Sequence, residues 1–397
     1  MVHNRTTLLF AGLFLSITLW GLPLSLKAAS SDLAVSGWIP YWKSSEGTRD
    51  AKKHLDALSE VNPFAFTVTS KGKLKDLAGL SKSTWKKFIA AARKDDVLVI
   101  PTIMWSDTET MHEILSDKKT RAKHVKEIVA MVKKGKYDGV DIDYEGRWLS
   151  TKDAFSLFIK ELDTALPRKT LLSCTIEAQT PPDSLYRIVP DTDVHPTNLS
   201  VMEEHCDSIK VMTYDQRRAD LQLNDTRKGQ PYVPVADADW VRKVIIYMTQ
   251  TVSPEKLSLG VATYGHEYEV VVSPDWFQAY NRLWALNPKY GVDAADDKDI
   301  TPTRNAAGEL SFSYTSIWNF SESLSIPANT PKGDIVATRA LAYANSTGQT
   351  VTFNYMTWSD AEAIREKVVL ADEFGLAGIA IFKIDGGEDK EIWELFE

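Results

Sequence analysis

Apolar residues are concentrated in eight short runs of the chain, each rich in Val, Ile, Leu and aromatic side chains. Most of these runs are apolar at nearly every position, which is typical of strands buried on both faces of a sheet. The runs are Val35–Trp42, Pro63–Thr69, Val97–Trp105, Tyr137–Glu145, Leu171–Ala178, Ser208–Asp215, Leu257–Tyr264 and Leu376–Asp385. We therefore predict eight β-strands.

Most of the gaps between these runs carry apolar residues at the spacing of an amphipathic helix. We predict helices at Thr84–Arg93, Lys118–Lys134, Thr151–Leu166, Ala238–Thr251 and Ser359–Phe374. Strands that alternate with helices eight times favour parallel βα units, and eight such units favour a closed barrel. The predicted fold class is therefore α/β, a (β/α)₈ TIM barrel that occupies residues 33–397.

The gap after the seventh run is too long for one helix, and residues 266–357 predict a small α+β insertion. It contains one helix-like piece, Pro274–Asn287, and two hairpin signals with turns at 305–308 and 345–348. Its aromatic residues could line a cleft or form the insertion's own core, and the core is favoured for most of them. They are Tyr314, Trp318, Tyr343, Phe353, Tyr355 and Trp358. A smaller irregular segment, Thr180–His205, follows the fifth run.

The N-terminus has the pattern of an export signal. Arg5 precedes an apolar run from Leu8 to Leu26, and small residues follow at 28–30. We expect residues 1–30 to be a signal peptide and the protein to be exported, with an uncleaved anchor as the alternative. Cys174 and Cys206 could pair in an exported protein, but two buried thiols are an equally open interpretation.

Composition excludes several classes of function. Among 397 residues, 46 basic and 54 acidic side chains give a net charge of −8, which argues against nucleic acid as a partner. Two Cys and seven scattered His form no zinc pattern, and no nucleotide-binding or nucleophile-elbow motif is present. We expect no metal, no cofactor, no membrane contact beyond a possible N-terminal anchor, and a monomer. Aromatic residues at 10% suit contact with sugar rings.

The most informative stretch is the fourth run, where three acids alternate with apolar residues. Alternate side chains of a strand share a face, so Asp141, Asp143 and Glu145 point together into the barrel. Glu145 lies nearest the C-terminal mouth. Like charges this close cannot all ionise, so the group must hold a proton near neutral pH. A protonated carboxyl at this end of a barrel is suited to general acid catalysis.

Three other interpretations of these acids are open. The acids could bind a divalent cation, but acids from one strand make a poor ligand shell alone. They could form a solvated face, which the apolar neighbours Val140 and Ile142 disfavour. They could persist in a binding protein that has lost its activity, although the terminal acid Glu145 is present.

Residues 138–145 (DGVDIDYE) resemble the signature of glycoside hydrolase family 18, Asp-x-x-Asp-x-Asp-x-Glu on the fourth barrel strand. Asp138, Asp141, Asp143 and Glu145 match it completely. Other runs are similar to the family's first, sixth, seventh and last strands, and the last of these resembles bacterial cell-wall and spore-cortex glycosidases. The resemblance implies the TIM barrel and, after its seventh strand, the insertion.

The resemblance also implies residue roles. Glu145 would protonate the glycosidic oxygen, and Asp143 would orient the substrate's N-acetyl group, whose oxygen attacks the anomeric carbon. Asp141 would share a proton with Asp143, and Tyr214 would hydrogen-bond the acetamido oxygen. Substrate contacts are expected from Asp138, Met212, Asp215, Trp42, Trp105, Tyr264, Trp358 and Phe382.

Two features depart from the family pattern. Phe382 stands where the last strand usually presents a Trp, so the sugar floor is smaller. Arg217 and Arg218 add positive charge near the rim; they could suit an acidic or peptide-bearing glycan, but pairing with nearby acids is favoured. The implied enzyme is a retaining glycosidase that acts on a polysaccharide containing N-acetylglucosamine. Chitin, peptidoglycan and a non-catalytic glycan-binding role remain open.

Overall fold

A computed structural model describes residues 33–315 and 324–396. The expected export signal at residues 1–30 and the aromatic residue Trp318 lie outside the described residues. Within the described ranges, no helix is both long enough and apolar enough to cross a membrane.

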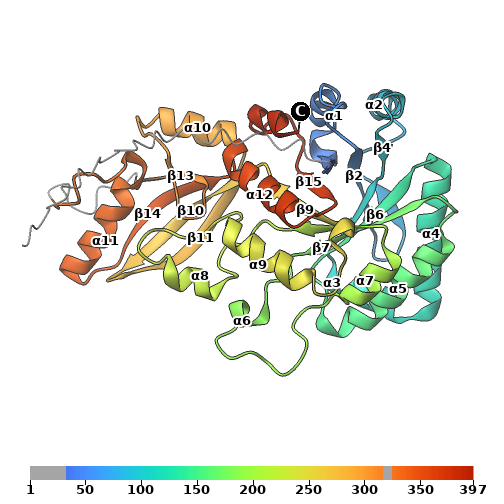
Figure 1. Cartoon of the computed structure of the whole chain (residues 1–397), viewed down its shortest axis with the longest axis horizontal. Coiled ribbons are helices and arrows are strands. Elements are labelled where there is room, and N and C mark those ends of the chain that lie inside the picture. The colour runs from blue at the N-terminus through green and yellow to red at the C-terminus, as the bar shows by residue number, and fades with distance from the viewer. Residues whose placement is uncertain (1–32, 316–323, 397) are drawn as a thin grey trace, which may run out of the picture. The chain divides into compact units, whose positions relative to one another are not determined.

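The barrel predicted from the hydrophobic pattern is present, and each of the eight runs overlaps a strand of it (Figure 1). The strands pair in parallel in the order β1-β15-β9-β8-β7-β6-β5-β2, and β2 pairs with β1 to close the ring. They are β1 (Ala34–Pro40), β2 (Glu60–Val68), β4 (Leu98–Val99) with β5 (Thr102–Trp105), β6 (Gly139–Tyr144), β7 (Leu171–Glu177), β8 (Ser208–Met212), β9 (Leu257–Ala262) and β15 (Gly378–Phe382). The short β3 (Leu74–Asp76) folds back on β2.

The helices around the barrel include the five that the sequence predicts, with ends shifted by a few residues. They are α1 (Ser44–Ala51), α2 (Ser83–Lys94), α3 (Thr108–Ser116), α4 (Lys118–Gly135), α5 (Lys152–Ala165), α6 (Pro182–Leu185), α7 (Leu199–His205), α8 (Leu221–Thr226), α9 (Ala238–Met248) and α12 (Ala361–Glu373). Acids precede several of them: the Asp117 side chain accepts from the backbone N–H groups of Lys119 and Thr120 in α4, and the Asp237 side chain accepts from that of Asp239 in α9. The main core lies between these helices and the outward faces of the strands.

The insertion after β9 is an antiparallel five-stranded sheet with two helices. Its strands are β10 (Gly265–Ser273), β11 (Trp276–Leu286), β12 (Thr303–Arg304), β13 (Leu310–Tyr314) and β14 (Val351–Trp358), in the order β11-β10-β14-β13-β12. Helix α11 (Ile335–Thr347) packs in one apolar cluster with Phe353 and Tyr355, and α10 (Pro288–Asp296) packs in another with Trp358. The insertion's aromatic residues thus mainly form its own core.

Two predictions within the insertion were wrong. Residues 274–287 are mostly strand β11, not a helix. A register irregularity opposite Val271 and Val272 puts Phe277 and Tyr280, three residues apart, on one face, which mimics helical spacing. Residues 345–347 end helix α11, and Gly348 caps it with φ of 73°, so this segment is not a hairpin turn. The hairpin at 305–308 is confirmed between β12 and β13.

Candidate active site

A cavity of about 480 Å³ opens at the carboxyl ends of the barrel strands. This is the end at which TIM barrels carry their active sites. The barrel strands and the residues just after them supply most of the lining: Trp38, Phe64, Asp143, Glu145, Thr175, Glu177, Met212, Tyr214, Asp215, Tyr264 and Phe382. Residues between and after these strands complete it: Ala178, Thr180, Leu185, His195, Gln216, Ala219 and Trp240. Seven of the residues predicted from the sequence meet here: Asp143, Glu145, Met212, Tyr214, Asp215, Tyr264 and Phe382.

The acids of β6 have the alternation that the sequence predicts. Tyr144 is fully buried on the helix side, where it packs on Phe158 and contacts His124. Asp141 and Asp143 have the opposite parity, and both are buried. Asp143 reaches the cavity, whereas Asp141 lies one step deeper in the barrel.

Asp141 is held by four donors from three other strands. Its Oδ2 accepts from Trp38 Nε1 at 3.1 Å and from Thr102 Oγ1 at 2.8 Å. Its Oδ1 accepts from Ser173 Oγ at 2.8 Å and Thr175 Oγ1 at 2.9 Å. Four donors satisfy a carboxylate's usual capacity, so this arrangement stabilises the negative charge of Asp141.

Asp143 has the opposite environment. Its side chain is buried, and Oδ1 has no hydrogen-bond partner among the described residues. Burial, followed by the nearby charges of Glu145, Asp141 and Glu177, raises the pKa of Asp143 well above its ordinary value, although Arg147 opposes this. The Asp143 carboxyl therefore holds a proton where an isolated aspartate would be ionised.

Glu145 directly follows β6 and lines the mouth of the cavity. Its backbone N–H donates to the Trp105 carbonyl at 2.9 Å, which extends the pairing with β5. Burial raises the pKa of the Glu145 carboxyl, and the charges of Glu177 and Asp215 add to this. Arg147 and a hydrogen bond with Asp143 act in the other direction. A raised pKa keeps a carboxylic acid available as a proton donor nearer neutral pH.

Five aromatic rings from different strands or strand ends form the floor of the cavity. Phe382 lies at their centre, with its ring centroid 5.9 Å from Trp38, 5.8 Å from Phe64 and 6.1 Å from Tyr264. Tyr214 stacks on it at 5.7 Å with the planes 17° apart. Such a floor presents flat apolar faces beside the two acids, as the binding of a sugar ring requires.

Tyr214 and Asp215 follow β8, which is separated from β6 by β7 in the barrel. Burial raises the pKa of the Tyr214 hydroxyl well above its ordinary value, so this group stays a neutral donor. His266 Nε2 lies 3.5 Å from Asp215 Oδ1, and burial lowers the pKa of His266 to about 4. Asp215 therefore faces an uncharged imidazole at neutral pH.

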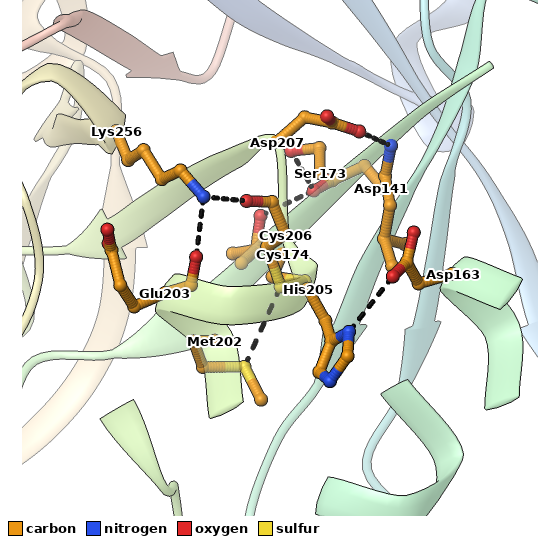
Figure 2. Close-up of a disulfide and its surroundings, with 12 residues drawn as sticks. Asp141, Asp163, Ser173, Cys174, Met202, Glu203, His205, Cys206, Asp207 and Lys256 are labelled. Atoms are coloured by element: carbon orange, nitrogen blue, oxygen red, sulfur yellow. Dashed lines mark hydrogen bonds and ion pairs between the residues drawn. A yellow bond between two sulfur atoms is a disulfide. The ribbon is translucent and has the colours of Figure 1, made fainter. Parts of the chain in front are cut away.

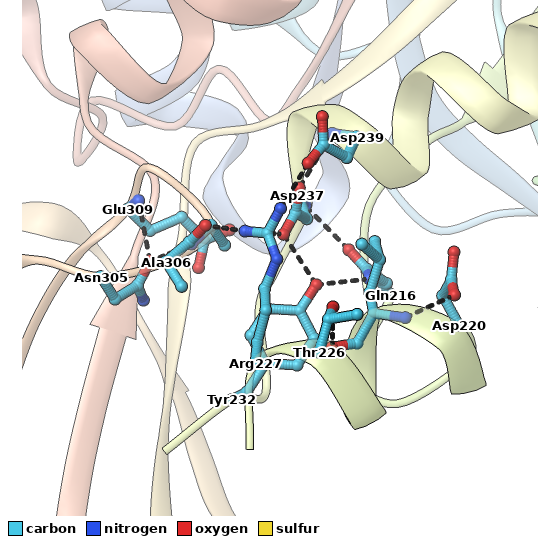
Figure 3. A network of polar contacts seen from close by, with 12 residues as sticks. Gln216, Asp220, Thr226, Arg227, Tyr232, Asp237, Asp239, Asn305, Ala306 and Glu309 are labelled. Carbon is cyan, nitrogen blue, oxygen red and sulfur yellow. Dashed lines mark hydrogen bonds and ion pairs between the residues drawn. The ribbon is translucent and has the colours of Figure 1, made fainter. Parts of the chain in front are cut away.

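The loop after Asp215 is fixed by a polar network that also reaches the insertion. Figure 3 shows Gln216, Tyr232 and Asp237 in contact: the Asp237 backbone N–H donates to Gln216 Oε1 at 2.8 Å, and Tyr232 Oη donates to Asp237 Oδ2 at 2.7 Å. Arg227 pairs with Asp237 at 2.7 Å and donates to the Ala306 carbonyl in the β12–β13 turn. The insertion and the rim of the cavity are thereby joined.

A disulfide supports the wall that holds Asp141. Cys174 of β7 is bonded to Cys206, which directly follows α7, so the two cysteines are paired and not free thiols (Figure 2). Because side chains alternate along a strand, Ser173 and Thr175 point inward to Asp141 while Cys174 between them points outward. The bond lies next to the two hydroxyls that hold the buried acid.

Four residues expected to contact substrate do not line the cavity. Asp138 starts the β6 region at the far end from the cavity, where its Oδ2 accepts from the Val99 backbone N–H at 2.9 Å. Trp105 is buried against Tyr144 on the helix side, because its parity matches that residue. Trp358 is fully buried under α10 in the insertion. Trp42 is half exposed and contacts Phe64 edge-on, but it does not line the cavity.

The structure adds residues that sequence reasoning missed. Glu177 ends β7 with inward parity and lines the cavity, where Arg147 pairs with it at 2.9 Å. The alternation of Ser173, Thr175 and Glu177 could have identified this acid. Arg217 and Arg218, expected to pair with acids, form no ion pair within the described ranges. Arg218 lies over the Tyr280 ring at 5.7 Å instead.

Relatives of known structure share this fold at low sequence identity. A chitinase from Chromobacterium violaceum superposes with a TM-score of 0.67 at 16% identity, over 92% of this chain and 98% of its own. The spore cortex-lytic enzyme SleL of Bacillus cereus gives a TM-score of 0.65 at 17% identity, over 92% and 73%. An uncharacterised glycosylase of Bacillus subtilis, YvbX, is 20% identical over 291 residues, which is 72% of this chain and 69% of YvbX.

The sequence model of glycosyl hydrolases family 18 matches residues 37–387, which include all of the barrel strands except the first three residues of β1, together with the row of acids and the insertion. The structure agrees with this match, because it has a closed barrel with two acids of raised pKa at the C-terminal mouth. Since the match covers most of the chain, the chain belongs to family 18 of the glycosyl hydrolases and is an O-glycosyl hydrolase.

Proposed function

We propose that this enzyme hydrolyses β-1,4 bonds next to N-acetylglucosamine in chitin or its oligosaccharides, with retention of configuration. The observation that carries the proposal is the pairing of Asp143 and Glu145 over the aromatic floor. Burial raises the pKa of both acids, so the pair retains a proton to higher pH than isolated carboxyl groups do. The hydrolysis of an acetal next to an acetamido group needs one proton donor and one group that orients the amide.

In the proposed mechanism the substrate supplies the nucleophile. When substrate binds, the acetamido N–H donates a hydrogen bond to a carboxylate oxygen of Asp143. Asp143 is then ionised, and the proton that the two acids share resides on Glu145. The acetamido oxygen then bonds to the anomeric carbon as the glycosidic bond breaks, and Glu145 gives its proton to the leaving oxygen. Water next attacks the anomeric carbon, returns a proton to Glu145 and reopens the acetamide.

The remaining residues position the acetamido group and stabilise charge. Tyr214 is a neutral hydroxyl that lines the cavity, and we assign it the hydrogen bond to the acetamido oxygen. We assign Asp141, which is held by four donors, the role of supplying negative charge beneath Asp143. It helps stabilise the positive charge that develops on the ring formed by the acetamido group.

A second candidate substrate is peptidoglycan. Arg217 is exposed on the loop next to Asp215, with a left-handed φ of 51°, and it makes no ion pair with a described acid. A cation free at the rim suits a glycan with carboxylate substituents. The structural relative SleL is named a spore cortex-lytic enzyme, whereas the relative from Cycas revoluta was solved with (GlcNAc)₃ at a TM-score of 0.64 and 14% identity.

The test compares three substrates with the wild type and Glu145→Gln. We expect the wild type to hydrolyse N-acetylated chitooligosaccharides but not their de-N-acetylated forms, and Glu145→Gln to bind without turnover. If the wild type hydrolyses purified peptidoglycan but not chitooligosaccharides, and Arg217→Gln lowers that activity, peptidoglycan is the substrate in place of chitin. Binding without turnover of any substrate by the wild type would support the non-catalytic alternative.

We also propose that the protein acts outside the cytoplasm. The Cys174–Cys206 disulfide supports this, since such bonds persist in oxidising compartments. Fractionation of cells that express the full chain tests it: the protein is expected in the envelope or medium, and recovery only from the cytoplasm would contradict export.

A further inference from the structure

The residue after the proposed general acid is held by a neighbouring strand. Glu177 ends β7, and its Oε1 accepts from the Gly146 backbone N–H at 2.8 Å. Gly146 has a φ of 65°, a conformation that glycine adopts without strain, so the chain turns sharply here. Because the Glu145 N–H is bound to Trp105, the backbone around Glu145 is fixed on both sides.

Arg147 binds the other carboxylate oxygen of Glu177. Its Nη2 donates to Glu177 Oε2 at 2.9 Å and to Thr197 Oγ1 at 2.6 Å, and its guanidinium lies 4.2 Å from the Phe155 ring centroid. The side chain has no exposed surface. Nε and Nη1 are buried and have no hydrogen-bond partner among the described residues.

A buried guanidinium with two unsatisfied atoms is costly, so its presence calls for an explanation. The packing of Phe155 could be achieved by an apolar side chain without this cost. What an apolar residue could not supply is a fixed positive charge beside Asp143 and Glu145. Arg147 acts on both of these acids, and so does Glu177 with the opposite sign.

We propose that Glu177 and Arg147 form a clamp that positions Glu145 and balances the charge around it. The role of Glu145 as general acid rests on the proposed function, whereas the clamp itself rests on the contacts above. Glu177 and Arg147 are positioning residues, because they act through Glu145 and its backbone. Their opposite charges let the clamp hold the loop rigidly without adding net charge to a cavity that already contains several acids.

The groups that face Glu145 come from every side of the cavity. They are Asp143 of β6, Arg147 of the following loop, Glu177 of β7, Tyr214 and Asp215 after β8, and Tyr264 after β9, with His195 on the same cavity wall. Burial is the main reason that the pKa of Glu145 is raised, and Glu177 is the next. Removal of the Glu177 charge stabilises ionised Glu145 and so lowers that pKa.

The experiment uses Glu177→Gln, which keeps an oxygen for the Gly146 N–H but loses the charge. The titration of Glu145 is followed by NMR of protein with ¹³C-labelled glutamate carboxyl groups, in which the signal of Glu145 is assigned by its absence from Glu145→Gln. In a second measurement, kcat is determined as a function of pH. We expect the midpoint of Glu145 and the basic limb of kcat to move to lower pH by about half a unit. On the acid side of the profile, kcat is expected to stay close to that of the wild type.

Glu177→Ala removes both the charge and the acceptor for Gly146. It is expected to lower kcat about tenfold with KM little changed, because the proton donor is misplaced while the aromatic floor is intact. The matched control is Glu373→Gln, since Glu373 pairs with Arg242 through two bonds of 2.6 and 2.7 Å on the surface.

An unchanged titration of Glu145 in Glu177→Gln, equal to that in Glu373→Gln, would overturn the clamp. So would a wild-type kcat in Glu177→Ala. If Glu177→Ala does not fold, the titration of Glu177→Gln alone decides. Because the titration needs no substrate, it also separates failure of the clamp from failure of the proposed function: an inactive wild type with a shifted Glu145 would leave the clamp supported.

Discussion

At the scale of single residues, two acids of the same strand, Asp141 and Asp143, differ in their hydrogen bonding because their surroundings differ. Asp141 has four donors, and Asp143, two positions further, has an Oδ1 with none among the described residues. The same residue type is thus fully hydrogen-bonded at one position, whereas at the other burial and neighbouring charges raise the pKa of its carboxyl. The parity of the row could be predicted from alternation. The four donors could not, because they come from β1, β5 and β7, and nothing local to β6 indicates them.

The proposed function assigns Phe382, at the centre of the aromatic floor, a contact with the bound sugar. Phe382→Ala is expected to weaken the binding of N-acetylchitotetraose by about 1.5 kcal/mol, roughly tenfold in Kd, because an apolar face is lost. The measurement is titration calorimetry with the inactive Glu145→Gln variant as the parent. Phe374→Ala, at the end of α12, serves as the control that leaves Kd unchanged. Equal affinities in the two variants would show that Phe382 is not part of the floor.

Glu388 couples stability to pH away from the cavity. Burial and a hydrogen bond with Asp50 raise the pKa of the Glu388 carboxyl to about 8. The unfolded chain releases this proton near pH 4.3, so the free energy of unfolding falls as pH rises from about 4.3 to 8. Glu388→Gln avoids this loss.

The expected result is therefore a Tm of Glu388→Gln that matches the wild type at pH 4 and exceeds it at pH 8. Glu391→Gln, on the exposed start of the C-terminal segment, is the control. A difference in Tm that is the same at both pH values would contradict the assignment.

At the scale of elements, the strands of the barrel were easier to predict than those of the insertion. Barrel strands are buried on both faces, so their sequences are apolar throughout and stand out from the helices. In β11 the two irregularities break the alternation, and in α11 the Asn-Ser-Thr-Gly sequence ends a helix as readily as it makes a turn. These outcomes depend on the partner strands, which local spacing does not identify.

The disulfide is the element-scale feature with the largest expected effect on stability. It closes a separation of 32 residues, and its removal in Cys174→Ala/Cys206→Ala is expected to cost about 3–4 kcal/mol. Urea unfolding of the oxidised wild type and the double variant measures this cost. Reducing agent should destabilise the wild type and leave the variant unaffected. Equal sensitivity of both proteins to reducing agent would contradict a structural role of the bond.

At the scale of the whole molecule, the barrel gathers at one mouth the side chains that its sequence disperses. Glu177 and Trp38 belong to distant parts of the chain, and they line one cavity only because parallel strands end at the same rim. The net charge of −8 argues against nucleic acid as a partner but does not indicate this arrangement of side chains. The acids of β6 could be found from the sequence because one strand carries them all. The residues that change the pKa values of these acids lie on other parts of the chain, so they could be identified only from the closed barrel.

The most direct test of the account follows the first product of hydrolysis by ¹H NMR. With N-acetylchitooligosaccharides, the wild type is predicted to release the β-anomer first, since attack by the acetamido oxygen and then by water retains the configuration. Glu145→Gln is predicted to bind the same oligosaccharide and release nothing. Initial release of the α-anomer, or turnover by Glu145→Gln at the wild-type rate, would contradict the assignment of Asp143 and Glu145.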